Sequence, residues 1–330
     1  MKNELASGLC RYKSLTGKVF VLGSYNQDLV YTLKTFPETG QTVIAQGFRS
    51  QPGGKGSNQA IASMKAGGKT HFVTKIGDDA YSVIARTFLE NCSFEDITLF
   101  RQENCPTGSA VVLVSELDED NSIVVCPGAN SMFTEEEIIA CFPSISASDV
   151  MVIQLEINAE AIRLALEYAS ENNITTILNP APYRDDVRKL LHLATYITPN
   201  ITEAEEIVGY KIDSESMTEK AALDIYSMGA ANVIITQGSS GCLLYDGRQF
   251  QYFCAFPAVS VDTSGAGDAF NGALAAMLAR GEIIENAITY ASAFSSLAVE
   301  RTGASNMPEH QDVINKLNRH ENAASFSFKS

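Results

Sequence analysis

The stretch DTSGAGDAFNG at 262–272 places three small residues between two aspartates, Asp262 and Asp268. Small residues let neighbouring backbone N–H groups converge on one point, and the apolar run from Ala269 to Leu278 predicts a helix. Convergent amides at a helix N-terminus attract an anion. Asp268 beside that anion could accept the proton of an attacking alcohol, as phosphoryl transfer requires. The alternative is that Asp268 only caps the helix after a glycine turn.

A second glycine-rich stretch, QPGGKGSNQA at 51–60, permits close approach of the backbone to a ligand. It is not a Walker A motif, because Gly56 follows Lys55 where Ser or Thr would stand. Asn58 offers both a donor and an acceptor, which suits a polyhydroxyl ligand. The alternative is a glycine turn that leads into a helix.

Two further polar stretches follow predicted strands. GSYNQD at 23–28 presents Asn26 and Asp28 after the first strand, where a binding site and a plain turn are both consistent with the residues. TQGSSG at 236–241 contains small residues that admit a nucleotide base or phosphate, or that only form a turn.

PNITEAE at 199–205 places Asn200 and Glu203 at a strand-to-helix junction. Both side chains suit a magnesium ion that is held largely through water. The alternative is an asparagine N-cap with an acid in the first helical turn.

The elements that position these stretches alternate along the chain. Short apolar runs predict strands, and longer periodic runs between them predict helices, so the sequence indicates βαβ units and a mostly parallel sheet. The predicted strands are 18–24, 71–77, 150–156, 175–182, 195–200 and 232–241; the predicted helices include 81–91, 159–172 and 201–209; and Asp-Gly within 243–253 predicts a hairpin.

Two β-rich stretches interrupt this alternation, within about 28–50 and 107–126. We expect them to form a small sheet apart from the main one. A sheet placed over the carboxyl ends of parallel strands could act as a lid, because ligands of open α/β sheets bind at that edge.

Composition excludes several classes of protein. The chain has 330 residues, 45% of them hydrophobic, so a large core can form. Its net charge of −15 and its lack of a basic stripe argue against binding nucleic acid. The seven cysteines form no CxxC pair, which favours reduced thiols in the cytoplasm, and the four scattered histidines do not suggest a structural zinc site.

The two ends of the chain lack these patterns. Residues 1–17 have no continuous apolar segment typical of a secretory signal, and we interpret them as an extension before the first strand. No apolar run reaches the ~18 residues needed to span a membrane. The last residues, 318–330, show no helical stripe, and we expect a frayed tail over 319–330.

Taken together, these stretches resemble the ribokinase (PfkB) family of carbohydrate kinases over residues 18–318, with the pentose kinases as the most similar members. Two glycine-rich signatures typical of that family occur here in the usual order and separation. The residues that carry the resemblance are GSYNQD, PGGKGSNQA, GDD at 77–79, IQLE at 153–156, NPAP at 179–182, TPNITEAE at 198–205, TQGSSG and DTSGAGDAFNG.

The resemblance implies a three-layer α/β/α sandwich with a mostly parallel central sheet and a β-sheet lid, which often also forms a dimer interface. It implies that Asp268 deprotonates the primary hydroxyl of the sugar, and that Gly265, Ala266 and Gly267 form the anion hole. The positions that match sugar contacts are Asn26, Asp28, Gly54, Lys55, Gly56, Asn58, Glu156 and Asp268 itself.

The resemblance also implies ATP, Mg²⁺ and an activating potassium ion. The positions that match nucleotide contacts are Asn200, Thr236, Gly238, Ser239, Gly241, Gly267 and Ser292. Asn200 and Glu203 match positions near Mg²⁺ and its waters. The potassium loop matches Asp262, Ser264, Ala298, Arg301 and Gly303, mostly through backbone oxygens.

The sequence departs from the family pattern around the potassium loop. Met307 stands where ribokinases often have a small hydroxyl residue, and Glu300 and Thr302 stand where Thr and Lys are common. The first of these changes puts one potassium ligand in doubt. The 17-residue extension has no counterpart in the family pattern.

The expected reaction is the ATP-dependent conversion of D-ribose to D-ribose 5-phosphate by a cytoplasmic homodimer. Asn26 favours ribose over 2-deoxyribose, since an amide left without its hydroxyl partner would cost roughly 1–3 kcal/mol. The alternatives are a kinase for 2-deoxyribose, another sugar or a nucleoside, and a sugar- or nucleotide-binding regulator on the same fold.

Overall fold

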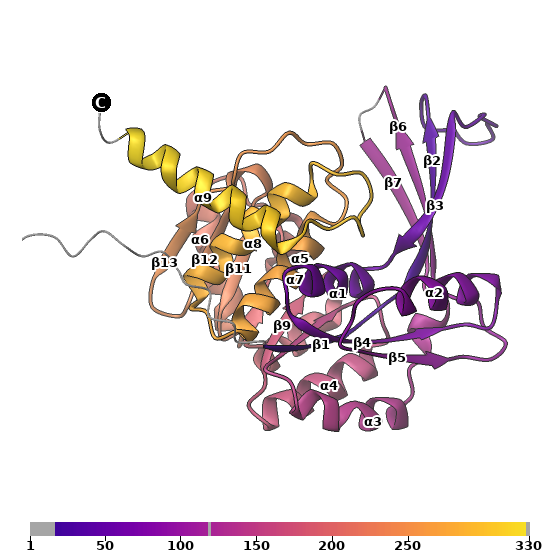
Figure 1. The fold of residues 1–330 in the computed structure, drawn as a ribbon, viewed down its shortest axis with the longest axis horizontal. Coiled ribbons are helices and arrows are strands. Elements are labelled where there is room, and N and C mark those ends of the chain that lie inside the picture. Colours follow the sequence, from indigo (N-terminus) through magenta and orange to yellow (C-terminus); the bar gives the residue numbers. More distant parts are fainter. Residues whose placement is uncertain (1–16, 118–119, 328–330) are drawn as a thin grey trace, which may run out of the picture.

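The computed structural model describes residues 17–117 and 120–327. In this part of the chain a nine-stranded sheet lies between two layers of helices, and a four-stranded sheet projects to one side (Figure 1). The predicted α/β/α sandwich with a separate small sheet is therefore confirmed. Residues 1–16, nearly all of the predicted extension, lie outside the described residues.

The large sheet is parallel over most of its width. Its strand order is β13-β12-β11-β10-β9-β8-β1-β4-β5, and only the pairs β11–β12 and β12–β13 are antiparallel. The predicted hairpin forms these last two strands. The strands are β1 (Lys18–Leu22), β4 (Lys69–Ile76), β5 (Asp96–Arg101), β8 (Val150–Gln154), β9 (Thr175–Asn179), β10 (Tyr196–Ile197), β11 (Val233–Thr236), β12 (Cys242–Tyr245) and β13 (Phe250–Phe253).

Helices cover both faces of this sheet, which explains the continuous apolar runs of its central strands. All five residues of β8 are buried. One core cluster lies beneath α1, α2, α7, α8 and α9, and the other beneath α3 to α6. The helices are α1 (Lys55–Lys65), α2 (Ala80–Glu90), α3 (Glu135–Ser146), α4 (Ala159–Glu171), α5 (Ile201–Val208), α6 (Glu215–Ser227), α7 (Ala266–Ala279), α8 (Ile284–Ala298) and α9 (His310–Ser327).

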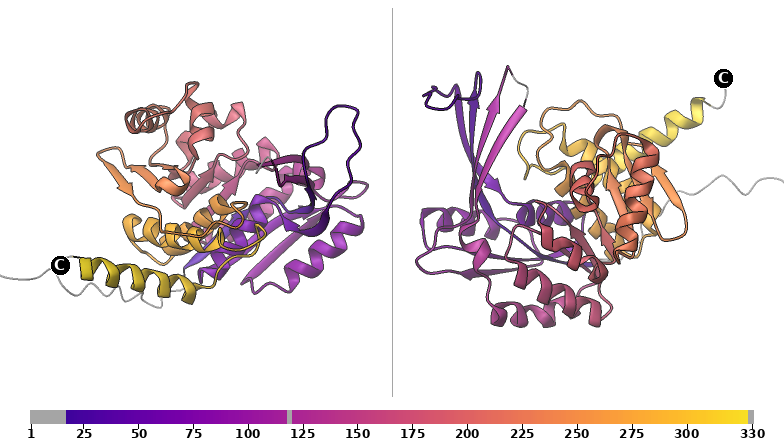
Figure 2. Two further views of the ribbon diagram at one scale, coloured as in Figure 1. Left: turned by 90° about the horizontal axis from the view of Figure 1, so that it is seen from above. Right: turned by 180° about the vertical axis from the view of Figure 1, so that it is seen from behind.

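The small sheet has the strand order β3-β2-β6-β7 and stands away from the helical layers (Figure 2). Its strands, β2 (Asn26–Leu33), β3 (Gly47–Gly53), β6 (Ser109–Ser115) and β7 (Asp120–Cys126), confirm the two predicted β-rich stretches. Three residues separate the end of β1 from the start of β2, and one residue, Gly54, separates the end of β3 from the start of α1. The lid is therefore connected directly to two of the predicted site loops.

The C-terminal segment differs from the expectation. Residues 318–327 do not fray but continue α9, which runs from His310 to Ser327. Its first part packs on α8 with Val313 fully buried, and this contact supports helix formation that the local sequence pattern does not indicate.

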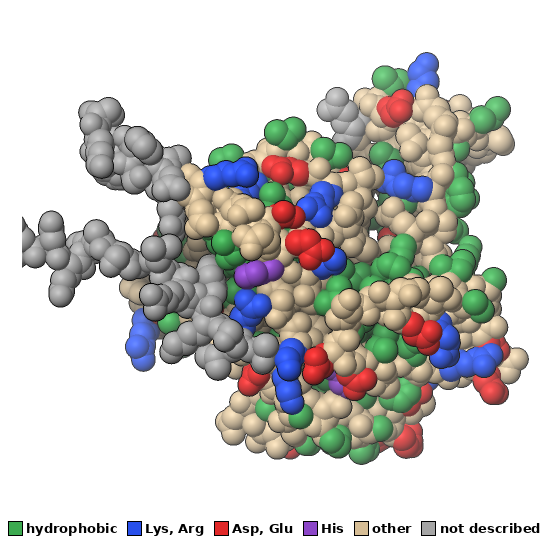
Figure 3. Space-filling view, in the orientation of Figure 1, with side chains coloured by type: hydrophobic (Ala, Val, Ile, Leu, Met, Phe, Trp, Pro, Cys, Tyr) green, Lys and Arg blue, Asp and Glu red, His purple; other side chains and the backbone are tan. Residues whose placement is uncertain are grey.

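Within residues 17–117 and 120–327, no helix is long and apolar enough to cross a membrane. The six cysteines of this part are free thiols. Basic and acidic side chains are interspersed on the face that carries α9 (Figure 3).

Candidate active site

A cavity of about 210 Å³ opens where the carboxyl ends of the parallel strands meet the start of α7. This is the edge at which ligands of open α/β sheets bind. The cavity brings together predicted residues from four distant stretches of the chain. Its walls are formed by Lys55, Asn179, Ala181, Thr198, Asn200, Glu203, Thr236, Thr263, Gly265, Ala266, Gly267, Asp268 and Asn271.

Asp268 is the third residue of α7, and it is 4% exposed. The N-cap of this helix is Gly265, whose φ of 77° is a left-handed conformation that glycine adopts without strain. The alternative that Asp268 caps the helix is therefore wrong. Its carboxylate instead lines the cavity from the first helical turn.

Two side-chain amides from α1 hold the Asp268 carboxylate. Asn58 Nδ2 donates to Oδ2 at 3.0 Å, and Gln59 Nε2 donates to Oδ1 at 2.9 Å. The two helices can approach so closely because a Cβ at Gly272 of α7 would lie 2.3 Å from the Gln59 carbonyl oxygen. These two donors occupy both oxygens of the carboxylate and fix its orientation.

The side-chain amide of Gln59 belongs to a longer series of buried hydrogen bonds. Its nitrogen also donates to Asn179 Oδ1 at 3.1 Å, and its oxygen accepts from Gln154 Nε2 at 2.7 Å. Both N–H bonds of Gln59 are thus used on acceptors, so its oxygen must face a donor. The Asp268 carboxylate determines which groups donate and which accept along this series, because an ionised carboxylate can only accept hydrogen bonds.

The small residues before Asp268 differ in how much open space and which hydrogen-bond partners surround them. A Cβ on Gly267 would meet no atom within 4 Å, so this residue faces open space in the cavity. The N–H of Ala266, however, donates to Thr263 O at 3.2 Å. In this structure Ala266 therefore has an internal partner, and an anion would have to compete for its N–H.

The other predicted sugar-binding residues gather around the start of α1. Glu156, in the turn after β8, accepts hydrogen bonds from Lys55 N at 2.9 Å and from Ser24 Oγ. This carboxylate joins the turn between β1 and β2 to the start of α1. Burial alone would lower the pKa of the Lys55 side chain, but the carboxylates of Asp268, Glu156 and Glu203 raise it.

Asp28 lies in the same group of carboxylates. Burial, followed by the charges of Glu156 and Asp268, raises the pKa of Asp28 to about 7. A Cβ at Gly53 would lie 2.1 Å from this carboxylate, and one at Gly56 would lie 2.4 Å from Ser24 N. These two glycines are therefore needed for packing within the protein, whatever their approach to a ligand.

Gly54 and Asn26 lie side by side at the base of the lid. Gly54 has a φ of 89°, and a Cβ there would lie 2.7 Å from Asn26 N, so only glycine fits this position well. Asn26 is 2% exposed, and its Oδ1 accepts from Asn130 Nδ2 at 2.8 Å.

Asn200 and Glu203 form the helix cap that was the alternative to a metal site. Asn200 Oδ1 accepts from Glu203 N at 2.8 Å, and Glu203 Oε2 accepts from Asn200 N at 2.9 Å. Burial raises the pKa of Glu203, against the effects of the Asn200 hydrogen bond and the Lys55 charge. Because both side chains are occupied with each other, they suit an ion held through water better than one bound directly.

Of the other residues predicted to bind the nucleotide, one lines the cavity and four do not. Thr236 lies beside Asn200 in a parallel bridge and lines the cavity. Gly238, Ser239 and Gly241 form the turn between β11 and β12, and Ser292 lies on α8 next to Cys242 of β12. These four residues lie outside the cavity walls.

The predicted potassium loop is held together by Asp262. Its Oδ1 accepts from Ser264 N and its Oδ2 from Gly303 N, both at 2.9 Å. It thus joins the segment before α7 to the segment after α8, as two halves of one cation site would need. Ala298 O accepts from Arg301 N at 3.0 Å, and the Arg301 side chain donates to Met307 O at 3.1 Å.

The site is supported by side-chain amides and hydroxyls that were not predicted from the sequence. Gln59 adjoins Asn58 within the same glycine-rich stretch, and Asn179 belongs to NPAP, so both were within reach of the motifs. Ser305 Oγ donates to Asn58 Oδ1 at 2.7 Å, and Thr198 Oγ1 to Asn271 Oδ1 at 2.6 Å. No local pattern marks these two pairs, because their members are 247 and 73 positions apart.

Comparison with known proteins agrees with this geometry. Residues 16–311 match the sequence profile described as pfkB family carbohydrate kinase. The ribokinase of Bacillus subtilis is 35% identical over 296 residues, which are 89% of this chain and 97% of that protein. A deoxyribokinase of Salmonella typhimurium is 31% identical over 286 residues, 86% of this chain and 93% of that protein.

Solved structures of ribokinases have a similar fold. A ribokinase from Giardia lamblia superimposes with a TM-score of 0.85 at 29% identity, covering 92% of this chain and 99% of that one. An Arabidopsis thaliana ribokinase complexed with ribose and ATP has a TM-score of 0.81 at 26% identity, with the same coverage.

Proposed function

Because this chain belongs to the pfkB family of carbohydrate kinases, we propose that it transfers the γ-phosphoryl group of ATP to the primary hydroxyl of D-ribose. The observation that carries this proposal is the position of Asp268. Its carboxylate lies at the start of a helix, next to the open backbone at Gly267, and is held by amides from α1.

In the proposed reaction Asp268 takes the proton from the sugar hydroxyl as its oxygen attacks the γ-phosphorus. The bond from this phosphorus to the bridging oxygen of the β-phosphate breaks, and ADP leaves with that electron pair. The Gly267 N–H and the positive end of α7 would stabilise the negative charge that develops on the transferred group. The Lys55 ammonium, whose pKa is raised, stays charged and adds to this field.

Several observations favour ribose over other alcohols. Asn26 and Asp28 lie at the base of the lid, and Glu156 accepts a hydrogen bond from the start of α1; these three side chains supply donors and acceptors that suit a polyhydroxyl ligand. The curated relative from Bacillus subtilis is a ribokinase, and a structural relative binds ribose and ATP. The Salmonella deoxyribokinase supports 2-deoxyribose as the second candidate. We favour ribose because Asn26 would lose a hydrogen-bond partner with the deoxy sugar.

The proposal includes two cations. Asn200 and Glu203 would hold the waters of a magnesium ion that accompanies ATP, since their own hydrogen bonds leave only outer-sphere contact. The two segments joined by Asp262 would supply backbone oxygens to a potassium ion, which adds positive charge beside the start of α7. The Arg49 guanidinium, 3.9 Å from Asp262 Oδ2, would compete with that ion for the same carboxylate.

We also propose a homodimer formed through the lid. All seven residues of β7 are exposed, and Ile123, Val124 and Val125 are 53%, 66% and 46% exposed. Such a cluster on an edge strand is suited to a partner. Val124→Asp should shift the mass measured by light scattering from dimer to monomer. The use of ATP and the free thiols support a cytoplasmic location.

The decisive experiment measures ADP release with ATP, Mg²⁺ and K⁺ for D-ribose, 2-deoxy-D-ribose, D-fructose, adenosine and pseudouridine. We expect kcat/KM for ribose to exceed the others by at least about tenfold, roughly 1.4 kcal/mol of discrimination. In the Asp268→Asn variant kcat should fall by about 10²- to 10⁴-fold while ribose still binds. A different best substrate would overturn the choice of sugar, and near-normal turnover in Asp268→Asn would overturn the base.

A further inference from the structure

Asn130 is a fully buried residue that clamps the base of the lid. It lies in a short 3₁₀ segment, η1 (Gly128–Met132), just after β7. Its Oδ1 accepts from Tyr25 N at 3.1 Å, and its Nδ2 donates to Tyr25 O at 3.0 Å and to Asn26 Oδ1 at 2.8 Å. One side chain thus holds the turn between β1 and β2 from a point about a hundred residues away.

These contacts settle which end of the Asn26 amide faces Asn130. The backbone N–H of Tyr25 can only donate, so the atom of Asn130 facing it must be the oxygen. The other atom of Asn130 is then the nitrogen, which lies beside the Tyr25 carbonyl, an acceptor. That nitrogen also faces Asn26, so the facing atom of Asn26 must be its oxygen. Asn26 therefore keeps its own N–H groups for another partner.

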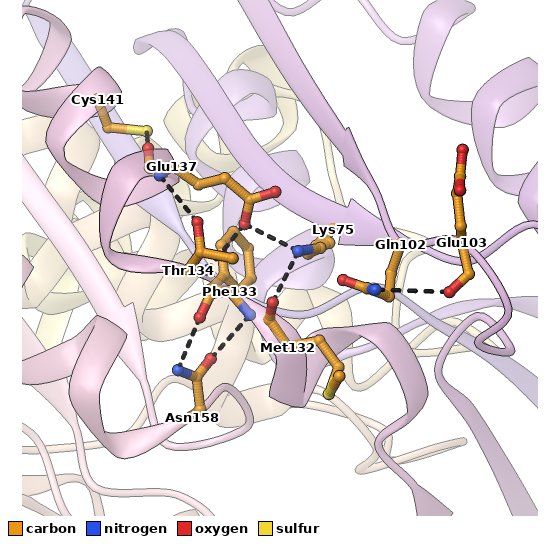
Figure 4. A network of polar contacts seen from close by, with 9 residues as sticks. All are labelled: Lys75, Gln102, Glu103, Met132, Phe133, Thr134, Glu137, Cys141 and Asn158. Carbon is orange, nitrogen blue, oxygen red and sulfur yellow. Dashed lines mark hydrogen bonds and ion pairs between the residues drawn. The ribbon is translucent and has the colours of Figure 1, made fainter.

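The segment that carries Asn130 is itself fixed by buried polar contacts (Figure 4). Lys75 of β4 is 1% exposed, and its ammonium donates to Met132 O at 2.7 Å and to Glu137 Oε2 at 2.9 Å. Asn158 exchanges two hydrogen bonds of 3.1 Å with the backbone of Phe133. The ion pair of the buried Lys75 with Glu137 and the two hydrogen bonds of Asn158 therefore hold the segment on the main sheet, so Asn130 cannot readily move with the lid.

We propose that Asn130 is a specificity-determining positioning residue that makes the Asn26 amide a hydrogen-bond donor toward the sugar. This inference rests on the proposed sugar kinase function. An amide whose oxygen is already occupied presents only N–H groups, and these can pair with the oxygen of a sugar hydroxyl. The same hydroxyl can donate its own proton to a carboxylate such as Asp28. 2-Deoxyribose lacks the oxygen of the 2-hydroxyl, so an Asn26 donor that pairs with this hydroxyl in ribose would remain unpaired.

Without Asn130, the side-chain amide of Asn26 would be free to rotate and to form hydrogen bonds with other partners. The protein would then lose affinity for the hydroxyl and, more specifically, would lose its ability to penalise a sugar that lacks it. A residue that merely stabilised the lid would lower kcat/KM for both sugars by the same factor. The ratio of the two values therefore separates positioning from general stability.

The test compares kcat/KM for D-ribose and 2-deoxy-D-ribose in wild type, Asn130→Ala and Asn130→Asp. The aspartate keeps the size of asparagine and the acceptor for Tyr25 N, but has no donor for Asn26 when ionised, so it remains informative if the alanine variant does not fold. We expect ribose kcat/KM to fall about tenfold and 2-deoxyribose kcat/KM to fall less than about threefold. KM for ATP should not change, which verifies that the fold is intact.

Two further variants make the assignment specific. Asn158→Ala removes two hydrogen bonds from the same segment but leaves the contact between Asn130 and Asn26, so the ratio between sugars should stay at the wild-type value. In Asn26→Ala the addition of Asn130→Ala should change the ratio no further, because the two residues act as a unit. An unchanged ratio in both Asn130 variants, or additive effects in the double variant, would overturn the inference. A wild type that does not prefer ribose would instead refute the proposed substrate.

Discussion

Gln59 Nε2 lies 2.9 Å from Oδ1 of Asp268, and the two residues join helices that are far apart in the sequence. The contact gives the proposed base a fixed orientation, because the second oxygen is held by Asn58 at 3.0 Å. Gln59 is itself held by Gln154 and Asn179, so the position of the carboxylate depends on the packing of α1 against the sheet.

Gln59→Leu should therefore impair catalysis more than binding. We expect kcat to fall about 10- to 100-fold, since one of two hydrogen bonds to the base is lost, and stability to fall by about 1–3 kcal/mol, because Asn179 and Gln154 lose a partner. Steady-state kinetics and thermal unfolding measure the two effects.

Gln27→Leu is the matched control for this variant. Gln27 is also a buried glutamine, with Nε2 donating to Ser50 Oγ and Gln51 O, both at 2.9 Å. It should cost a similar amount of stability with little change in kcat. If the two variants had equal kcat, Gln59 would be a structural residue only.

Asp28 predicts how sugar binding depends on pH. Its pKa is raised to about 7, whereas an aspartate in an unfolded chain has a pKa near 4. If only the ionised carboxylate accepts hydrogen bonds from the sugar, the Kd for ribose should rise roughly tenfold between pH 8 and pH 6. Calorimetric titration measures this, and Asp28→Asn should bind weakly with little pH dependence. A wild-type Kd that is constant over this range would contradict the assignment.

The same shift has a consequence for stability. Between about pH 4 and pH 7 the folded state binds more protons at Asp28 than the unfolded state does, so this residue makes the protein less stable as the pH rises. The effect is complete above about pH 7. Asp28→Asn should therefore gain stability relative to wild type on going from pH 4 to pH 8, by an amount of order 1–4 kcal/mol. Denaturant titrations at the two pH values test the sign.

Sequence patterns predicted the parts of this protein that depend on local spacing. The alternation of strands and helices, the β-rich lid and the stretch around Asp268 all follow from periodicity and from glycine signatures within about ten residues. Asn200 and Glu203 were also recognisable, although the sequence left cap and metal site open, and the structure shows the cap.

What the sequence could not reveal are contacts between distant polar residues. Asn58 and Asp268 are 210 positions apart, and Asn26 and Asn130 are 104 apart. An amide in a strand end or a short 3₁₀ segment has no periodic signal, so only tertiary packing shows whether it is bonded. The end of α9 was mispredicted for a related reason: residues 318–327 carry no apolar stripe of their own, and they continue a helix whose first part packs on α8 through Val313.

Potassium should activate the enzyme. The Asp262 carboxylate joins the two segments of the predicted loop. Among the described cationic side chains, only that of Arg49 forms an ion pair with it, at 3.9 Å. We expect several-fold higher kcat in potassium chloride than in tetramethylammonium chloride at equal ionic strength. Arg49→Gln removes the competing cation and should lower the half-activating potassium concentration by less than about fivefold, the range of an exposed ion pair. Equal rates in the two salts would remove the cation from the mechanism.

Alanine substitutions at the two glycines that flank Ala266 should have opposite effects on stability. Gly267 lies within α7, and a Cβ there would meet no protein atom within 4 Å, so Gly267→Ala should leave stability unchanged or raise it by up to about 1 kcal/mol. Its methyl group would project into the space proposed for the γ-phosphate, and kcat/KM for ATP should fall by at least about tenfold. Gly265 has a φ of 77°, and a Cβ there would lie 2.8 Å from Ala304 O, so Gly265→Ala should lower both stability and activity. Thermal unfolding combined with ATP kinetics separates the two variants. A stable Gly267→Ala enzyme with wild-type kinetics would show that the transferred phosphoryl group does not pass over this turn, and would move the anion hole away from the start of α7.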